Sequence, residues 1–150
     1  MGDQYNIKVF ESLPDDETLI KMARCLWRGC PDKYDDGFIW WKNLFISKEV
    51  NYNFVVMTEK ISDIDDCIGH VVFFQSSEDS SKWLISNLKT FTPFRRNGIA
   101  YIMLVTGIER IKSIGGEKIY VFIDRENVPS INLHIKLGFV QEKEAFDGFN

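Results

Sequence analysis

Hydrophobic and polar residues recur along the chain with two different periods, and each period predicts one type of element. Alternation of apolar and polar residues, or a continuous β-branched and aromatic run, predicts strands over residues 5–10, 53–58, 67–75, 83–90 and 119–123. Apolar residues spaced three and four apart predict amphipathic helices between Pro14 and Gly29 and over residues 36–46 and 99–114. A short helix is expected between Asn127 and Leu137, and residues 139–144 are the candidate for a last strand.

The order of these elements predicts an α+β domain built on a mixed sheet. Residues 53–58 and 67–75 are separated by a short acidic turn, which favours an antiparallel hairpin. The later order of strand, helix and strand implies a crossover connection, and a crossover places its two strands parallel. The chain contains no internal repeat, low-complexity tract or linker, so its 150 residues are expected to form a single domain.

Composition and charge argue against several classes of protein. Hydrophobic residues make up 45% and charged residues 27% of the chain, as in soluble globular domains, and no apolar run is long enough to span a membrane. The net charge of −4 argues against a nucleic-acid-binding protein. The three cysteines form no metal-binding pattern, so we expect no metal site. Together with the absence of a signal-peptide pattern in residues 1–10, they favour the reducing cytoplasm.

A short stretch that precedes the helix of residues 99–114 has the composition of an anion-binding loop. Gly98 and Ala100 let the backbone approach a ligand closely, and the N–H groups at a helix start favour negative charge. Arg95 and Arg96 add cationic groups that suit phosphate oxygens. The stretch therefore predicts a pyrophosphate site, and an ordinary basic turn is the alternative.

Two segments in the second half of the chain together resemble the GNAT superfamily of acyl-CoA-dependent N-acyltransferases. Residues 95–100, Arg-Arg-Asn-Gly-Ile-Ala, are similar to the superfamily's acyl-CoA loop, in which Arg or Gln is followed by x-x-Gly-x-Gly/Ala. Residues 127–139 are similar to its later motif, an Asn followed by a helix that closes on Leu-Gly-Phe. The strand expected between the two segments makes the joint match more specific than either segment alone.

The resemblance implies a GNAT-like fold: a mixed, mostly antiparallel central sheet with helices on both faces and a parallel pair of strands that splays apart at the acyl-CoA site. It also implies acetyl-CoA as the co-substrate. Backbone N–H groups of the loop would hold the pyrophosphate, and one near Lys89 or Thr90 would polarise the thioester carbonyl. Asn127 has a simple helix cap as its alternative role. The residues implied in coenzyme binding are Leu88, Lys89, Thr90, Arg95, Arg96, Asn97, Gly98, Ile99, Ala100, Asn127 and Ser130.

Two histidines are the candidates for catalysis. His134 occupies the position at which the superfamily usually has a tyrosine, the proposed acid that protonates the leaving thiolate. A cationic histidine can donate a proton near neutral pH, and a packing role is the alternative. His70, on the preceding strand, could serve as the general base directly or through water, with a half-buried structural role as the alternative. Glu78 and Asp79 are further candidates for the base.

These features predict an N-acetyltransferase in which a primary amine of a small molecule or peptide attacks the thioester directly. Aromatic and acidic residues in the first half of the chain could bind a cationic amine, although such aromatics are more often core. The alternative is a non-catalytic acyl-CoA-binding or sensing module, favoured by the missing tyrosine. The superfamily's final strand is expected to be short or missing after residue 139, and a homodimer could cover the open sheet edge.

Overall fold

A computed structural model describes residues 4–47, 53–61, 66–90 and 98–141 of the chain. The strands and helices expected from the hydrophobic pattern up to residue 137 are all present. In chain order they are β1 (Gln4–Phe10), α1 (Asp16–Leu26), the 3₁₀ turn η1 (Pro31–Lys33), α2 (Tyr34–Ile46), β2 (Asn53–Ile61), β3 (Asp66–Gln75), β4 (Lys82–Thr90), α3 (Ile99–Ser113), β5 (Lys118–Val121) and α4 (Val128–Lys136).

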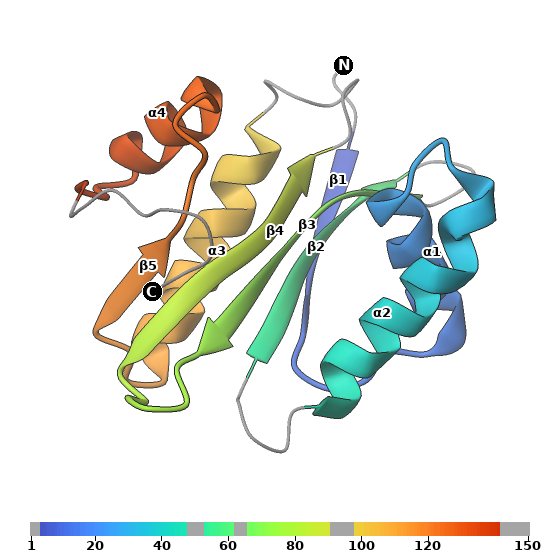
Figure 1. The fold of residues 1–150 in the computed structure, drawn as a ribbon, viewed down its shortest axis with the longest axis horizontal. Helices are drawn as coiled ribbons and strands as arrows, with labels where there is room; N and C mark the ends of the chain where they lie inside the picture. Colours follow the sequence, from blue (N-terminus) through green and yellow to red (C-terminus); the bar gives the residue numbers. More distant parts are fainter. Residues whose placement is uncertain (1–3, 48–52, 62–65, 91–97, 142–150) are drawn as a thin grey trace.

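The strands form one mixed sheet in the order β1-β2-β3-β4-β5 (Figure 1). The first four strands are antiparallel neighbours, and β5 runs parallel to β4. α1 and α2 cover one face of the sheet, and α3 covers the other (Figure 1). This arrangement confirms the predicted α+β fold, with a mostly antiparallel sheet, helices on both faces and one parallel pair.

Alternation along the central strands produces a hydrophobic core on each face of the sheet. On β2, Val55 and Met57 belong to the core under α1 and α2, which also buries Trp41. Phe54 and Val56, the neighbours of Val55 on the same strand, belong to the core under α3. One strand serves two cores because successive side chains of a strand point to opposite faces. The sheet is therefore the shared middle layer that fixes the helices relative to one another.

α1 lies between the predicted limits, Pro14 and Gly29, and α2 begins slightly before its predicted range. Asp15 caps α1 by accepting a hydrogen bond from the Thr18 N–H at 2.9 Å. Gly29 follows the helix with a φ of 85°, a conformation that glycine adopts without steric cost. α2 begins at Tyr34, earlier than the predicted residue 36, because the 3₁₀ turn η1 leads directly into it.

Two predicted strands differ from the structure at their ends. β5 ends at Val121, whereas the sequence predicted a strand through residue 123. Residues 139–141 are irregular and Val140 is 87% exposed, so the described part of the predicted last strand is not a strand. Residues 142–144 lie outside the described residues. Strand propensity reflects packing against neighbours, and these apolar residues have no neighbouring strand in the described structure.

The contact between α3 and the sheet depends on Gly107. A Cβ at this position would overlap the ring of Phe73, which is fully buried and stacks on Phe54 with the ring centroids 4.9 Å apart. Gly107→Ala is therefore expected to lower the free energy of unfolding by about 1–2 kcal/mol, because overpacking outweighs the gain in helix propensity. Urea unfolding measures this loss.

The matched control for this prediction is Glu109→Ala on the exposed side of the same helix, which should change stability by less than about 0.5 kcal/mol. Phe73→Leu removes the ring that the new methyl group meets. The double variant should therefore be more stable than the sum of the two single losses. Strictly additive losses would show that Gly107 does not set the spacing between α3 and β3.

Candidate functional site

The parallel strands β4 and β5 separate part of the way along β4. Their paired residues run only from Lys82 and Lys118 to Ile85 and Val121. β4 then continues to Thr90, while β5 has already ended. In the described structure, residues 86–90 therefore have β3 on one side and no paired strand on the other. This opening is the splayed parallel pair that was expected at an acyl-CoA site.

A β-bulge lies in β4 at the beginning of this opening. His70 of β3 pairs with Lys89, but Val72 pairs with Ser86, so β4 contains one residue more than β3 between the two pairs. Asn87 lies within the bulge with a φ of 53°, the one positive φ of a non-glycine residue in the described chain. Asparagine tolerates this left-handed conformation better than most residues. The bulge was not predicted from the sequence, in which the local signal is an asparagine, a residue depleted in strands, inside the strand pattern.

His70 lies directly beside the bulge and is 1% exposed. Its Nδ1 is 2.9 Å from the carbonyl oxygen of Asn87. Because a carbonyl only accepts, Nδ1 carries the proton and donates it. On the other side, the ring of Trp41 meets the imidazole edge to face, with the centroids 4.9 Å apart and the planes at 82°. Nε2 is buried and has no hydrogen-bond partner among the described residues.

Burial lowers the pKa of His70 from its ordinary 6.5 to about 4, and the positive charge of Lys89 acts in the same direction. The hydrogen bond to Asn87 opposes this shift only in part. The imidazole is therefore neutral at physiological pH. A buried neutral histidine holds a fixed tautomer, and this one carries its proton on Nδ1.

The depressed pKa predicts a loss of stability in acid. Above pH 6.5, neither the folded nor the unfolded chain protonates His70, and its contribution is fully present. As the pH falls from 6.5 towards 4, the unfolded chain binds a proton that the folded chain excludes, so stability falls. Between pH 7.5 and pH 5 the loss is expected to be about 2 kcal/mol. The free energy of unfolding in urea, measured for wild type and His70→Asn over this pH range, isolates the loss due to His70, because the variant lacks the titrating group. Parallel pH profiles of the two proteins would contradict the prediction.

Two cationic side chains attach the end of α1 to the sheet next to the opening. The Lys89 ammonium donates to the carbonyl oxygen of Leu26 at 2.7 Å. The Arg28 guanidinium donates to the carbonyl oxygen of Cys67, on β3, also at 2.7 Å. Carbonyls in the last turn of a helix lack intrahelical partners, so Lys89 also satisfies the end of α1. The α1–α2 side of the molecule is therefore held directly against the open part of β4.

The predicted anion site depends on the backbone at the start of α3. Gly98 is its N-cap residue, with a φ of 75°, and no side chain caps the helix. The first intrahelical bond joins the Ile102 N–H to the Gly98 carbonyl at 3.0 Å, so the amides of Ile99 and Ala100 precede it. A Cβ built on Gly98 would meet no atom of the described residues within 4 Å, which leaves the backbone accessible from that part of the chain. Residues 95–97 of the loop lie outside the described residues.

α4 contains the remaining candidates. Asn127 caps the helix by accepting a hydrogen bond from the Ser130 N–H at 3.3 Å, which confirms the predicted cap. His134 is 2% exposed, its Nδ1 donates to the Ser130 carbonyl at 2.7 Å, and its ring meets Phe139 edge to face. Its Nε2 is buried without a hydrogen-bond partner among the described residues. The Lys136 ammonium lies over the ring of Tyr101, 5.2 Å from its centroid, and so brings α4 against the first turn of α3.

The structure brings some of the predicted site residues together and separates others. His70 and Lys89 are paired across β3 and β4. Leu88 packs into the α3 core instead, because its side chain points to the opposite face. Glu78 and Asp79 lie in the turn before β4, and the rise of about 3.3 Å per residue separates the two ends of this strand by about 26 Å. Both acids are therefore far from the opening. Hydrogen bonds from Ser81 also lower the pKa of Asp79, which shows that this carboxylate is committed to its own turn.

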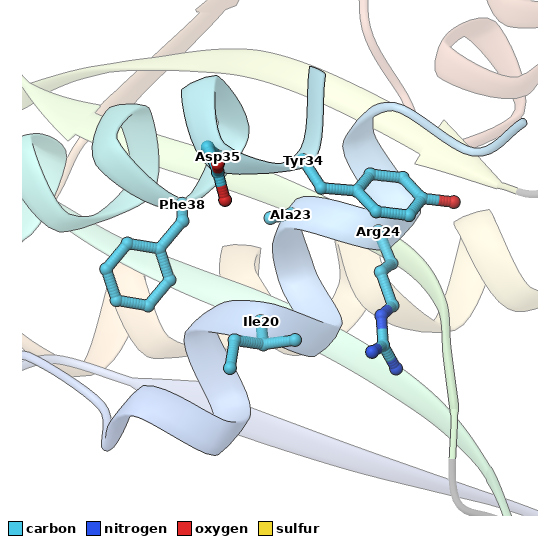
Figure 2. Close-up of a pocket in the computed structure, with 6 residues that line it drawn as sticks. All are labelled: Ile20, Ala23, Arg24, Tyr34, Asp35 and Phe38. Atoms are coloured by element: carbon cyan, nitrogen blue, oxygen red, sulfur yellow. The ribbon is translucent and has the colours of Figure 1, made fainter. Parts of the chain in front are cut away.

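A groove of about 410 Å³ lies between α1 and α2. Figure 2 shows Asp35 extending from α2 towards α1, with the rings of Phe38 and Tyr34 on either side and Arg24 opposite. Among the aromatic residues of the first half, which the sequence left open between core and binding site, Trp41 belongs to the core. Tyr34 and Phe38 line the groove, and Phe38 also packs against that core.

The described residues contain no group of three or more His, Cys, Asp or Glu side chains that could hold a metal ion. None of the described helices has both the length and the apolar character that crossing a bilayer requires.

Solved structures with a similar fold include several aminoglycoside acetyltransferases. HMB0005 from an uncultured soil metagenomic sample is 19% identical, with a TM-score of 0.70 over 96% of this chain and 97% of that chain. AAC(6')-Iy with a bisubstrate analogue, CoA-S-monomethyl-acetylneamine, is 18% identical, with a TM-score of 0.67 over 98% of each chain. meta-AAC0020 from an uncultured soil metagenomic sample, in complex with sisomicin, is 15% identical, with a TM-score of 0.69 over 97% of this chain and 95% of that chain.

At these identities the likeness shows a shared fold. No curated protein sequence matches the chain. The family itself is shown by the model of the acetyltransferase (GNAT) family, which matches residues 11–139 and so includes the β4 bulge, the start of α3 and α4. The chain therefore belongs to the acetyltransferase (GNAT) family.

Proposed function

We propose that the chain, as a single domain of residues 1–150, transfers an acetyl group from acetyl-CoA to a primary amine. The observation that carries the proposal is the opening between β4 and β5, which begins at the Asn87 bulge and coexists with an uncapped, accessible start of α3. Extended backbone without a neighbouring strand offers N–H and C=O groups to an amide-containing ligand. A helix start without a side-chain cap offers N–H groups to a phosphate.

The chain offers candidate residues for two parts of acetyl-CoA, the pyrophosphate and the pantetheine arm. The amides at Gly98, Ile99 and Ala100, with residues 95–97, would hold the pyrophosphate, and the open backbone at residues 88–90 would run beside the pantetheine arm. Asn127 and Ser130, at the start of α4, would contact the arm. The cap uses the Asn127 Oδ1 and the backbone N–H of Ser130, so the N–H groups of the Asn127 amide remain able to donate. The Ser130 hydroxyl lies 3.5 Å from Nδ1 of His134 and has further bonding capacity.

The reaction that follows is a direct transfer. A neutral amine nitrogen attacks the thioester carbonyl, and an N–H of β4 near Lys89 or Thr90 stabilises the oxygen that becomes negative. The carbon–sulfur bond then breaks, the amide forms and the sulfur leaves as a thiolate. His134 in its cationic form would give the thiolate a proton from Nε2, while Nδ1 keeps its bond to Ser130. The amine must lose one proton in the same reaction, and His70 through its Nε2 remains the proposed acceptor.

The acceptor is proposed to be a small-molecule or peptide amine that approaches from the α1–α2 side. Lys89 ties the end of α1 to the open part of β4, and Arg28 ties it to β3. The groove between α1 and α2 presents the Asp35 carboxylate and aromatic rings, which suit an ammonium group, beside the Arg24 guanidinium, which would repel one. Aminoglycosides belong in a screen because the solved structures of similar fold include aminoglycoside acetyltransferases. None of the three cysteines forms a disulfide, which agrees with the proposed cytoplasmic location.

A non-catalytic acyl-CoA-binding module is the second candidate. A histidine stands where the family usually has its tyrosine acid, and the other histidine near the opening, His70, is almost completely buried with a lowered pKa. Both observations concern proton transfer, and neither concerns the backbone groups proposed to bind the coenzyme. The two candidates therefore differ in turnover and agree in affinity for acetyl-CoA.

Calorimetric titration with acetyl-CoA, with ATP as the control, tests the binding that both candidates share. Selective binding of acetyl-CoA supports the site, whereas equal binding of ATP or no binding contradicts it. Release of free thiol with a panel of amines, including aminoglycosides and peptides, then decides between the two. Turnover with any amine supports the enzyme, and tight binding without turnover on a broad panel supports the binding module.

A further inference from the structure

We infer that His70 is a positioning residue for this reaction: its Nδ1–H binds the Asn87 carbonyl and so fixes the left-handed bulge that directs the backbone of the open part of β4. The inference rests on the proposed function only for the role of that backbone. The contact itself is a feature of the folded chain, at 2.9 Å between Nδ1 and the carbonyl oxygen.

The bulge needs a partner for two reasons. A left-handed φ at a residue other than glycine costs conformational energy, and Asn87 has a φ of 53°. A bulge also interrupts the ladder and leaves backbone groups of the extra residue without their usual cross-strand partner. Asn87 itself is exposed, whereas His70 is buried, and a buried N–H without an acceptor costs about 1–3 kcal/mol. The bond therefore joins the carbonyl of the bulge to a histidine N–H that needs an acceptor.

The surroundings of His70 hold the ring in the one orientation that makes this bond. The side chain is 1% exposed and meets the edge-to-face ring of Trp41 on the side of α2. Since the ring is neutral, it has a single N–H, and the bond to Asn87 determines that this N–H is on Nδ1. Packing and tautomer therefore act together, and neither depends on a bound ligand.

The bulge decides which way the residues after it face. Leu88 packs into the core under α3, whereas the Lys89 ammonium binds the end of α1 on the opposite face. Loss of the extra residue from the ladder would shift the register by one, and a shift of one residue exchanges the two faces. Leu88 would then turn towards α1 and Lys89 towards the apolar core. The backbone N–H groups on the side of the opening would change places in the same step.

This role uses a different ring nitrogen from general-base catalysis. A base would work through Nε2, which has no hydrogen-bond partner among the described residues. The positioning role works through Nδ1. An asparagine amide lies close to the place of Nδ1, whereas a glutamine amide lies close to the place of Nε2. The variants His70→Asn and His70→Gln therefore separate the two roles with side chains of similar chemistry.

The experiment measures acetyl-CoA affinity by calorimetry and turnover by thiol release for wild type, His70→Asn and His70→Gln. We expect His70→Asn to bind within about threefold of wild type and His70→Gln to bind more than about tenfold more weakly, since only asparagine preserves the bond. Asn87→Gly in the His70→Gln background should restore most of the affinity, because glycine adopts the left-handed conformation unaided. Turnover of the two single variants reports on the proposed base role of Nε2, whereas their affinity for acetyl-CoA reports on the positioning role of Nδ1. Normal binding of acetyl-CoA by His70→Gln would overturn the inference, whatever its turnover.

A second measurement keeps this test independent of the proposed function. Long-range proton–nitrogen correlation in the free protein should show His70 as the Nδ1–H tautomer, with a hydrogen-bond coupling to the Asn87 carbonyl carbon. The Nε2–H tautomer would overturn the inference even if acetyl-CoA binds. If wild type fails to bind acetyl-CoA while the Nδ1–H tautomer is present, the proposed function fails and the structural part of the inference stands. If the His70→Gln single variant does not fold, recovery of the fold in the double variant with Asn87→Gly supports the inference, and no recovery contradicts it.

Discussion

Gly98→Trp is expected to weaken acetyl-CoA binding by more than about 100-fold, the loss of nearly 3 kcal/mol. Gly98 begins α3 with its backbone accessible, and an indole ring there would occupy the space into which a phosphate must come. Calorimetric titration measures the change in Kd. Gly98→Ala adds a single methyl group, so its effect should be much smaller than that of the tryptophan.

The other end of the same helix provides the matched control. Gly115 follows α3 with a φ of 92° and, like Gly98, has no atom within 4 Å of a built Cβ. Gly115→Trp therefore introduces the same backbone strain and the same ring in open space, away from the proposed phosphate site. Its thermal stability should fall by a similar amount and its affinity for acetyl-CoA should not change. Equal loss of affinity in both tryptophan variants would attribute the effect to destabilisation and remove Gly98 from the site.

The order of elements could be predicted from the sequence because it depends on local patterns. The alternation on β2 and the caps at Asp15 and Asn127 each act within a few residues. The mixed sheet followed from the order of those elements. The end of β5 could not be predicted, because pairing with β4 stops at Ile85 and Val121 for reasons that lie in the neighbouring strand. A hydrophobic pattern does not contain that information.

The candidate site shows the same division between local and tertiary features. Gly98 and Asn127 were identified because helix starts have local signals. The bond from His70 to Asn87 joins two strands, and the bond from Lys89 to Leu26 joins residues 63 positions apart. Such contacts exist only once the sheet has fixed its register and the bulge has turned Lys89 towards α1. Residues 95–97, central to the sequence argument, lie outside the described residues, so their role stays a prediction.

His134→Phe is expected to lower kcat by about 100-fold while the Kd for acetyl-CoA stays within about twofold of wild type. Nδ1 of His134 donates to the Ser130 carbonyl and lies 3.5 Å from the Ser130 hydroxyl, and the ring packs edge to face on Phe139. Phenylalanine keeps the ring and the packing but has no proton to give. Its effect should therefore fall on the step in which the thiolate leaves. Thiol-release kinetics with a turned-over amine measures kcat, and calorimetry measures the Kd.

His134→Tyr is the informative partner of this variant, because a phenol stands at this position in most members of the family that the chain resembles. Tyrosine differs from phenylalanine by one hydroxyl group, so any recovery of kcat between the two variants measures proton donation from this position. Packing on Phe139 is available to both, and their unfolding midpoints should therefore be similar. Recovery of at least about tenfold in kcat, without a change in Kd, is the expected result. A phenylalanine variant that turns over at the wild-type rate would show that the Nε2 of His134 donates no proton and that the thiolate leaves into water.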